Sequence, residues 1–198
     1  MNTNLILLVD NQKVNHHFYK YLIKFLKDHS INFIQITSLK DLEKIKDKHQ
    51  YIKGAIFSGS YKRILRPHSK ANIALMTKVI ETLDVPVLGI CYGMQFINLY
   101  CKGRIEELPE FCNKKILIKT VKKHKLLKNT NQTFFAECRN HDIVVKVGTN
   151  TNALVKLNDY IQVTANDKLK LYGTQFHPEL KKSTFPILLN FIYDICGY

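Results

Sequence analysis

Short apolar runs alternate with amphipathic stretches through the first half of the chain. The runs have the length and composition of buried strands, and they lie at residues 5–9, 31–36, 54–58 and 86–90. Apolar residues at three- and four-residue spacing predict helices over residues 14–28, 39–47, 70–82 and 92–101. Ser38 is a suitable N-cap for the second helix. Strands and helices in this alternation predict an α/β fold, with a mainly parallel sheet covered by helices on both faces.

The pattern changes after Gly103. Six short runs rich in β-branched residues and bounded by turn residues follow, at residues 115–121, 132–138, 143–147, 153–157, 160–164 and 169–176. They predict an antiparallel β extension of the parallel sheet, and an amphipathic segment at 184–195 predicts a closing helix. Neither a repeat nor a linker interrupts the sequence, so residues 1–198 are expected to form a single domain.

Charge changes this picture little. The 198 residues contain 30 Lys and Arg against 16 Asp and Glu, a net charge of +14, which is typical of proteins that bind nucleic acid. Only Arg63, Arg66, Arg104 and Arg139 are arginines, however, and arginine is the residue best suited to read bases and phosphates. Nucleic acid is therefore a disfavoured partner. The lysine-rich segment 114–128 is interpreted as a solvated face or as a basic rim for an acidic partner.

The cysteines and the apolar runs exclude several other classes. Five cysteines without a CxxC pair argue against a disulfide framework and a zinc site, so no metal or cofactor is expected. The N-terminal apolar run is too short for a secretory signal, and none of the apolar stretches approaches the roughly 18 residues of a membrane span. These features predict a cytoplasmic protein that does not enter a membrane.

Candidate chemistry begins at Cys91. The segment PVLGICYGMQ (residues 86–95) runs from a buried strand directly into a helix, and Gly89 and Gly93 flank the cysteine in a G-x-nucleophile-x-G elbow. Neighbours without a Cβ allow the tight turn, and the helix N-terminus favours thiolate over thiol. Cys91 is therefore the candidate nucleophile.

A base and an oxyanion site follow from two other strand ends. In GTQFHPEL, a strand through Phe176 would place His177 and Glu179 on the same side, as a base and the carboxylate that orients it. Gly59 follows another strand, so its backbone N–H and that of Tyr92 are candidate oxyanion donors. Because the carboxyl ends of parallel strands share one edge of a sheet, these groups are expected to meet near Cys91.

The motifs GICYGMQ, SGSY, NHD and GTQFHPE, in this order, resemble those of the class I (triad-type) glutamine amidotransferases over about residues 5–196. The resemblance implies a flavodoxin-like fold and a Cys91–His177–Glu179 triad that hydrolyses L-glutamine through a γ-glutamyl thioester. It further implies oxyanion donors at Gly59 and Tyr92 and no cofactor. The resemblance also assigns substrate contacts to Gln95 and to a loop containing Asn140, His141 and Asp142.

Tyr92, the Met94-Gln95 pair and the ending NFIYDICG look most like the glutaminase of GMP synthase. The resemblance then implies that ammonia passes to a separate ATP-dependent synthetase, with the one that aminates XMP as the first candidate. The synthetases for anthranilate, aminodeoxychorismate or imidazole glycerol phosphate are alternatives.

Three departures from the family pattern leave other functions open. The oxyanion loop reads Ser58-Gly59-Ser60-Tyr61 where the family commonly has SGGP or PGPG, and γ-glutamyl peptidases of the superfamily can carry Ser after that glycine. Lys102-Gly103 replaces a Gly-Gly pair, and Leu180-Lys181-Lys182 follows the HPE motif in place of the His-Thr often seen in GMP synthases. A γ-glutamyl hydrolase without a synthetase, or a catalytically silent basic module, are therefore alternative interpretations.

Overall fold

A seven-stranded sheet forms the centre of the computed structural model, which describes residues 3–12, 17–120 and 122–198. The strand order is β2-β1-β3-β4-β9-β8-β7. Five strands are parallel: β1 (Leu5–Val9), β2 (Phe33–Ile36), β3 (Ile52–Phe57), β4 (Val87–Ile90) and β9 (Leu171–Thr174). Two antiparallel strands extend the sheet beyond β9: β8 (Tyr160–Asn166) and β7 (Asn152–Leu157). The parallel part has the flavodoxin-like order, as predicted.

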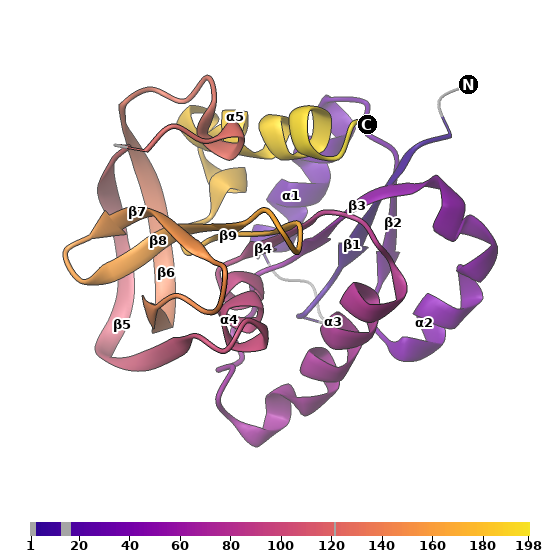
Figure 1. Ribbon diagram of the computed structural model, residues 1–198, viewed down its shortest axis with the longest axis horizontal. Coiled ribbons are helices and arrows are strands. Elements are labelled where there is room, and N and C mark those ends of the chain that lie inside the picture. Colours follow the sequence, from indigo (N-terminus) through magenta and orange to yellow (C-terminus); the bar gives the residue numbers. More distant parts are fainter. Residues whose placement is uncertain (1–2, 13–16, 121) are drawn as a thin grey trace.

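Helices cover both faces of this sheet (Figure 1). On one face lie α1 (His17–Asp28) and α5 (Phe185–Leu189), and on the other lie α2 (Leu39–Lys44), α3 (Lys70–Thr82) and α4 (Tyr92–Tyr100). Strand β1 shows why: Ile6 and Leu8 pack into one core and Leu7 and Val9 into the other, all fully buried. A strand that is apolar on both sides is stable only when both sides are covered.

A separate two-stranded ribbon packs beside the β7–β8 end of the sheet (Figure 1). It consists of β5 (Arg104–Lys119) and β6 (Thr133–Lys146), whose register shifts between Glu107 and Cys112. Alternate residues such as Ile116, Ile118 and Phe134 face the core, while the residues between them are largely exposed. The ribbon therefore has one apolar face against the domain and one face toward solvent.

Most predicted elements are confirmed, some with shifted ends. The strand at 5–9 and the helix at 70–82 have the predicted bounds, and Ser38 caps α2 by accepting a hydrogen bond from the Asp41 amide. Helix α2 ends at Lys44, before the predicted residue 47, and a 3₁₀ helix (Lys46–Tyr51) follows. The start of the predicted helix at 14–16 lies outside the described residues.

Three predictions for the second half of the chain differ from the structure. The predicted strand at 115–121 is only the second half of β5, and the predicted strands at 132–138 and 143–147 are one continuous strand, β6. The last predicted helix continues from α5 as a π-helix (Asn190–Ile195). Pro109 lies within β5 where the register of the ribbon shifts, a position at which strands tolerate proline.

No described helix combines the length and apolar character needed to cross a membrane.

Candidate active site

Cys91 lies on a strained turn between β4 and α4. Its backbone has φ 51° and ψ −103°, a conformation that costs free energy for any residue with a side chain. The turn is held because the Cys91 amide donates a 2.7 Å hydrogen bond to the Thr174 carbonyl at the end of β9. A Cβ on Gly89 would lie 2.3 Å from the carbonyl carbon of Gly93, so this close approach requires glycine. The predicted elbow is thus present.

His177 and Glu179 lie together beside this turn, though not because of strand alternation. Strand β9 ends at Thr174, earlier than predicted, and His177 precedes a 3₁₀ turn (Pro178–Leu180) that carries Glu179. The His177 amide donates a 3.0 Å hydrogen bond to the Glu137 carbonyl of β6, which fixes the turn. The His177 Nδ1 atom is 2.7 Å from Glu179 Oε1, and both side chains are almost completely buried.

The charge state of His177 follows from these contacts. Burial on its own lowers the pKa of His177, but the negative charge of Glu179 and hydrogen bonds to Cys91 and Glu179 outweigh it and raise the pKa to about 10. The raised pKa favours the protonated imidazole, which is hydrogen-bonded to the Glu179 carboxylate on one side and to the Cys91 sulfur on the other.

Gly59 is adjacent to both groups. A Cβ on Gly59 would lie 2.8 Å from His177 Cε1 and 3.7 Å from the Cβ of Cys91. Tyr92 is the first residue of α4, where a backbone N–H has no acceptor within its own helix. Gly59 and Tyr92 therefore both lie next to Cys91, and their role as oxyanion donors stays a prediction.

Two residues that the sequence did not single out orient the loop around Gly59. Asn11 Nδ2 donates a 2.9 Å hydrogen bond to the Ser58 carbonyl, and Gln12 Nε2 donates one of 3.1 Å to the Gly59 carbonyl. The Ser58 carbonyl and the Gly59 N–H belong to one trans peptide, in which they point in opposite directions. The hydrogen bond from Asn11 to the Ser58 carbonyl therefore orients the Gly59 N–H away from Asn11. The Ser60 hydroxyl, unusual for the family, donates to the Asn11 carbonyl at 3.1 Å.

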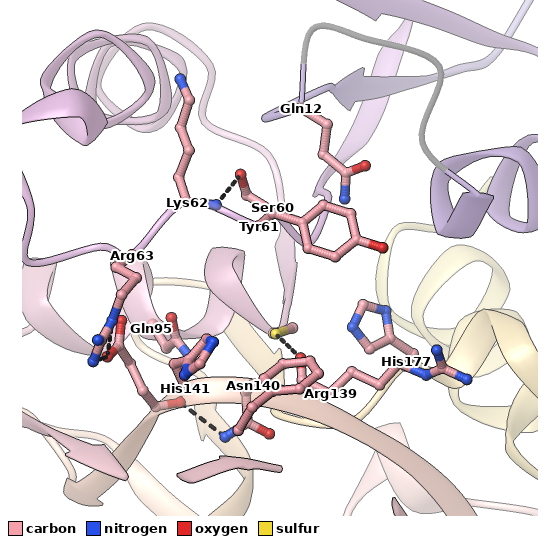
Figure 2. Close-up of a pocket in the computed structure, with 13 residues that line it drawn as sticks. Gln12, Ser60, Tyr61, Lys62, Arg63, Gln95, Arg139, Asn140, His141 and His177 are labelled. Atoms are coloured by element: carbon pink, nitrogen blue, oxygen red, sulfur yellow. Dashed lines mark hydrogen bonds and ion pairs between the residues drawn. The ribbon is translucent and has the colours of Figure 1, made fainter. Parts of the chain in front are cut away.

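A pocket of about 210 Å³ opens above Cys91 (Figure 2). Figure 2 shows Arg63 and Gln95 on one side of it and His177 on the other. Arg63 Nη2 lies 2.7 Å from Asp142 Oδ1 and 3.1 Å from Glu107 Oε2. The pocket is lined by Gln12, Ser60, Tyr61, Lys62, Arg63, Cys91, Gln95, Phe111, Arg139, Asn140, His141, Asp142 and His177.

The predicted substrate-binding segment lies in this wall, but as part of a strand. Asn140, His141 and Asp142 belong to β6, opposite the register shift of β5, so the prediction of a loop was wrong. Asn140 is buried, and its side chain accepts from Cys138 Sγ and donates to the Asp142 carbonyl, both within β6. His141 is exposed, and its ring lies 4.7 Å from that of Phe111. Gln95 Nε2 donates a 2.6 Å hydrogen bond to the Asp142 carbonyl.

The part of the chain that the structure describes holds no cluster of three His, Cys, Asp or Glu side chains suited to a metal ion, and its five cysteines are free.

Comparison with known proteins identifies the family of the chain. Residues 7–195 match the family model of the class-I glutamine amidotransferases. The chain is 28% identical over 200 residues to the GMP synthase [glutamine-hydrolyzing] of Clostridium tetani and 34% identical over 170 residues to that of Dictyostelium discoideum. These alignments cover 99% and 80% of this chain but only 37% and 23% of the two relatives.

Two solved structures show the same fold. A protein of Thermoplasma acidophilum described provisionally as a GMP synthase subunit superposes with a TM-score of 0.84 at 19% identity, covering 98% of this chain and 94% of that one. A glutamine amidotransferase of Thermotoga maritima gives 0.73 at 15% identity, with 98% and 84% covered. The chain belongs to the class I glutamine amidotransferase family.

Proposed function

We propose that this protein hydrolyses L-glutamine to L-glutamate and ammonia, with Cys91, His177 and Glu179 as a catalytic triad. The observation that carries the proposal is the buried His177–Glu179 pair, 2.7 Å apart, hydrogen-bonded to a cysteine on a strained elbow beneath a small pocket. A nucleophile, its base and the group that orients the base are the parts that acyl transfer requires.

The reaction runs in two halves. The Cys91 thiolate attacks the side-chain carboxamide carbon of glutamine, and the backbone N–H groups of Gly59 and Tyr92 stabilise the oxyanion. The protonated His177 gives its proton to the departing nitrogen, the C–N bond breaks, and ammonia leaves a γ-glutamyl thioester on Cys91. His177 then takes a proton from water as that water attacks the thioester, and glutamate leaves with the thiolate restored.

The opposite side of the pocket suits the α-substituents of an amino acid. Glutamine carries an ammonium and a carboxylate, and Arg63 and Asp142 supply one charge of each sign there. A volume of about 210 Å³ is below the range typical of drug-sized ligands, which favours a small metabolite. Gln95 and Asn140 act by donating hydrogen bonds to the Asp142 carbonyl, which hold β6 in place. His141 lines the exposed edge of the pocket.

The ammonia is proposed to pass to a separate ATP-dependent synthetase, with amination of XMP by GMP synthase as the first candidate. The names of the curated relatives support this, and the chain spans only about a third of the length of the first of them. The basic residues around the site are a weaker support, because two of them already pair within the protein: Arg66 with Glu107, and Lys181 with Glu137.

A γ-glutamyl hydrolase is the second candidate, and the Ser58-Gly59-Ser60-Tyr61 loop favours it. The experiment measures glutamate release from glutamine and from γ-glutamyl peptides, with and without a GMP synthase synthetase domain, in the wild type and in Cys91→Ala. Release from glutamine that rises with the synthetase supports the first candidate. Hydrolysis of γ-glutamyl peptides at a rate that the synthetase does not change supports the second candidate. Absence of turnover and of Cys91 labelling by a glutamine-analogue inactivator, with and without the synthetase, would overturn both.

A further inference from the structure

Gln175 is a buried polar side chain beside the candidate nucleophile that the mechanism above does not use. It follows β9, is fully inaccessible to solvent, and its backbone N–H donates a 2.8 Å hydrogen bond to the Gln162 carbonyl of β8. Its Nε2 atom lies 3.6 Å from Cys91 Sγ, within hydrogen-bond range for sulfur. The side chain thus contacts the sulfur without lining the pocket.

The contacts of Gln95 determine which end of the Gln175 amide faces the sulfur. Gln95 Nε2 donates to the Asp142 carbonyl at 2.6 Å, an acceptor that only an N–H can pair with, so the amide orientation of Gln95 is fixed. The same Nε2 atom lies 3.4 Å from Gln175 Oε1. The Gln175 oxygen therefore points at Gln95, and its NH₂ group points at Cys91.

The sulfur lies between one acceptor and this donor. On the β6 side, Cys91 Sγ is 3.5 Å from the Arg139 carbonyl, to which a thiol can donate and a thiolate cannot. A carbonyl alone would therefore favour the neutral thiol, whereas an N–H donor favours the thiolate. The other charged or titratable groups around the sulfur, among the described residues, are His177, Glu179 through His177, Cys138, and, along the pocket wall, Tyr61, Lys62, Arg63, Arg139, His141 and Asp142.

We propose that Gln175 is a thiolate-stabilising residue, whose side-chain N–H offsets the Arg139 carbonyl and, with His177, keeps Cys91 in its reactive form. The chain of amides from the Asp142 carbonyl through Gln95 and Gln175 also joins the substrate wall to the nucleophile. The proposal rests on the proposed function only in taking Cys91 as the nucleophile.

Alkylation of Cys91 by iodoacetamide tests this without requiring turnover. The pH dependence of the rate is followed by mass spectrometry of the Cys91 peptide, so the other four cysteines do not interfere. Gln175→Met keeps an unbranched side chain of similar length but removes the donor. We expect the pH midpoint of alkylation to rise by about one unit, so that the rate falls about tenfold at pH values below both midpoints.

Gln162→Met is the matched control. Gln162 is also a buried glutamine, and its Oε1 atom has no hydrogen-bond partner among the described residues. We expect its midpoint to equal that of the wild type. An unchanged midpoint in Gln175→Met, or an equal shift in both variants, would overturn the proposal.

Gln175→Glu keeps the shape of the side chain, and it serves as the second variant if Gln175→Met does not fold. It replaces the donor by an oxygen, so the midpoint is expected to rise at least as far as in Gln175→Met. In both variants of Gln175, kcat for glutamine should fall with little change in KM. If the shift occurs but the wild type does not hydrolyse glutamine, the proposed function fails while Gln175 retains its assigned role.

Discussion

The parallel sheet and the β5–β6 ribbon contribute to the candidate site in different ways. The parallel strands place Cys91 and Gly59 at one edge through backbone hydrogen bonds and contacts that leave no room for a Cβ. The ribbon holds the His177 amide through the Glu137 carbonyl, and it contributes the side chains of Arg139 and of Asp142, which pairs with Arg63. The reacting groups are thus fixed by backbone contacts, whereas the substrate wall is built by polar side-chain pairing.

This difference predicts that the two regions affect different kinetic parameters. Groups fixed by the sheet should determine the chemical step, because reacting atoms must be held rigidly. Groups on the ribbon should determine binding of the α-substituents, which lie away from the reacting carbon. Substitutions on the sheet edge should therefore lower kcat, and substitutions on the ribbon should raise KM.

Removing the nucleophile gives the largest expected effect. Cys91→Ala should lower kcat by about 10⁴–10⁶-fold, because the covalent route is lost. Glutamate release and trapping of the γ-glutamyl thioester by mass spectrometry measure it. Cys112→Ser, on the half-buried cysteine of β5, is the control and should retain activity. Turnover in Cys91→Ala above that of a blank would refute the covalent mechanism.

Glu179→Gln tests the carboxylate that orients and charges the base. We expect kcat to fall by about 10²–10⁴-fold, the range typical of general acid–base catalysis. Removing the negative charge also lowers the pKa of His177 from its raised value of about 10, so the alkaline limb of the pH–rate profile should move to lower pH. An unmoved limb would mean that Glu179 does not set the charge of His177.

The same pair makes stability depend on pH. The pKa of His177 is raised in the folded state, so its contribution to the free energy of unfolding is complete below its unfolded pKa of about 6.5 and is lost as the pH rises toward about 10. Denaturation of the wild type should show this loss, and Glu179→Gln should show a flatter dependence over that range. Parallel curves would contradict the raised pKa.

Gly59→Ala tests the close approach at the oxyanion loop. The new Cβ would lie 2.8 Å from His177 Cε1, so the loop or the imidazole must move. Loss of one oxyanion donor typically costs about 10²–10³-fold in kcat, and we expect a fall of this size. Gly197→Ala is the control: a Cβ there meets nothing within 4 Å, and the strain that its φ of 65° imposes on alanine lies at the C-terminal end of the chain. A fall in both variants would indicate a general effect of replacing glycine.

The two regions also differ in how far the sequence predicts them. The elbow, the His-Pro-Glu turn and the parallel strands follow local rules, so β1, α3 and the position of Cys91 were predicted correctly. The ribbon did not follow such rules, because Pro109 and the solvent-facing charges of β5 leave its sequence without a clear alternation of apolar and polar residues.

Gln175 and Arg63 were missed for a related reason. Their partners lie far along the chain: Cys91 is 84 positions from Gln175, and Asp142 is 79 positions from Arg63. Such pairs exist only once the sheet and the ribbon are assembled. The polar Asp10-Asn11-Gln12 turn after β1 was the one available signal for the brace around Gly59, since side chains at strand carboxyl ends gather at such sites.

The smallest expected effect separates the two regions most directly. Asp142→Asn keeps the shape of the buried carboxylate on β6 but removes its charge, which weakens the pair with Arg63 at the substrate wall. The Asp142 backbone carbonyl still accepts from Gln95, so the strand should stay in place. We expect KM for glutamine to rise by about 10–100-fold with kcat nearly unchanged, as for loss of a charge-assisted hydrogen bond.

Glu107→Gln is the control, because it removes the other carboxylate that contacts Arg63. The Glu107 side chain is 42% exposed, so this substitution should change KM by no more than about twofold. If Asp142→Asn lowers kcat as strongly as Gly59→Ala, the ribbon takes part in the chemical step and the division between the two regions fails.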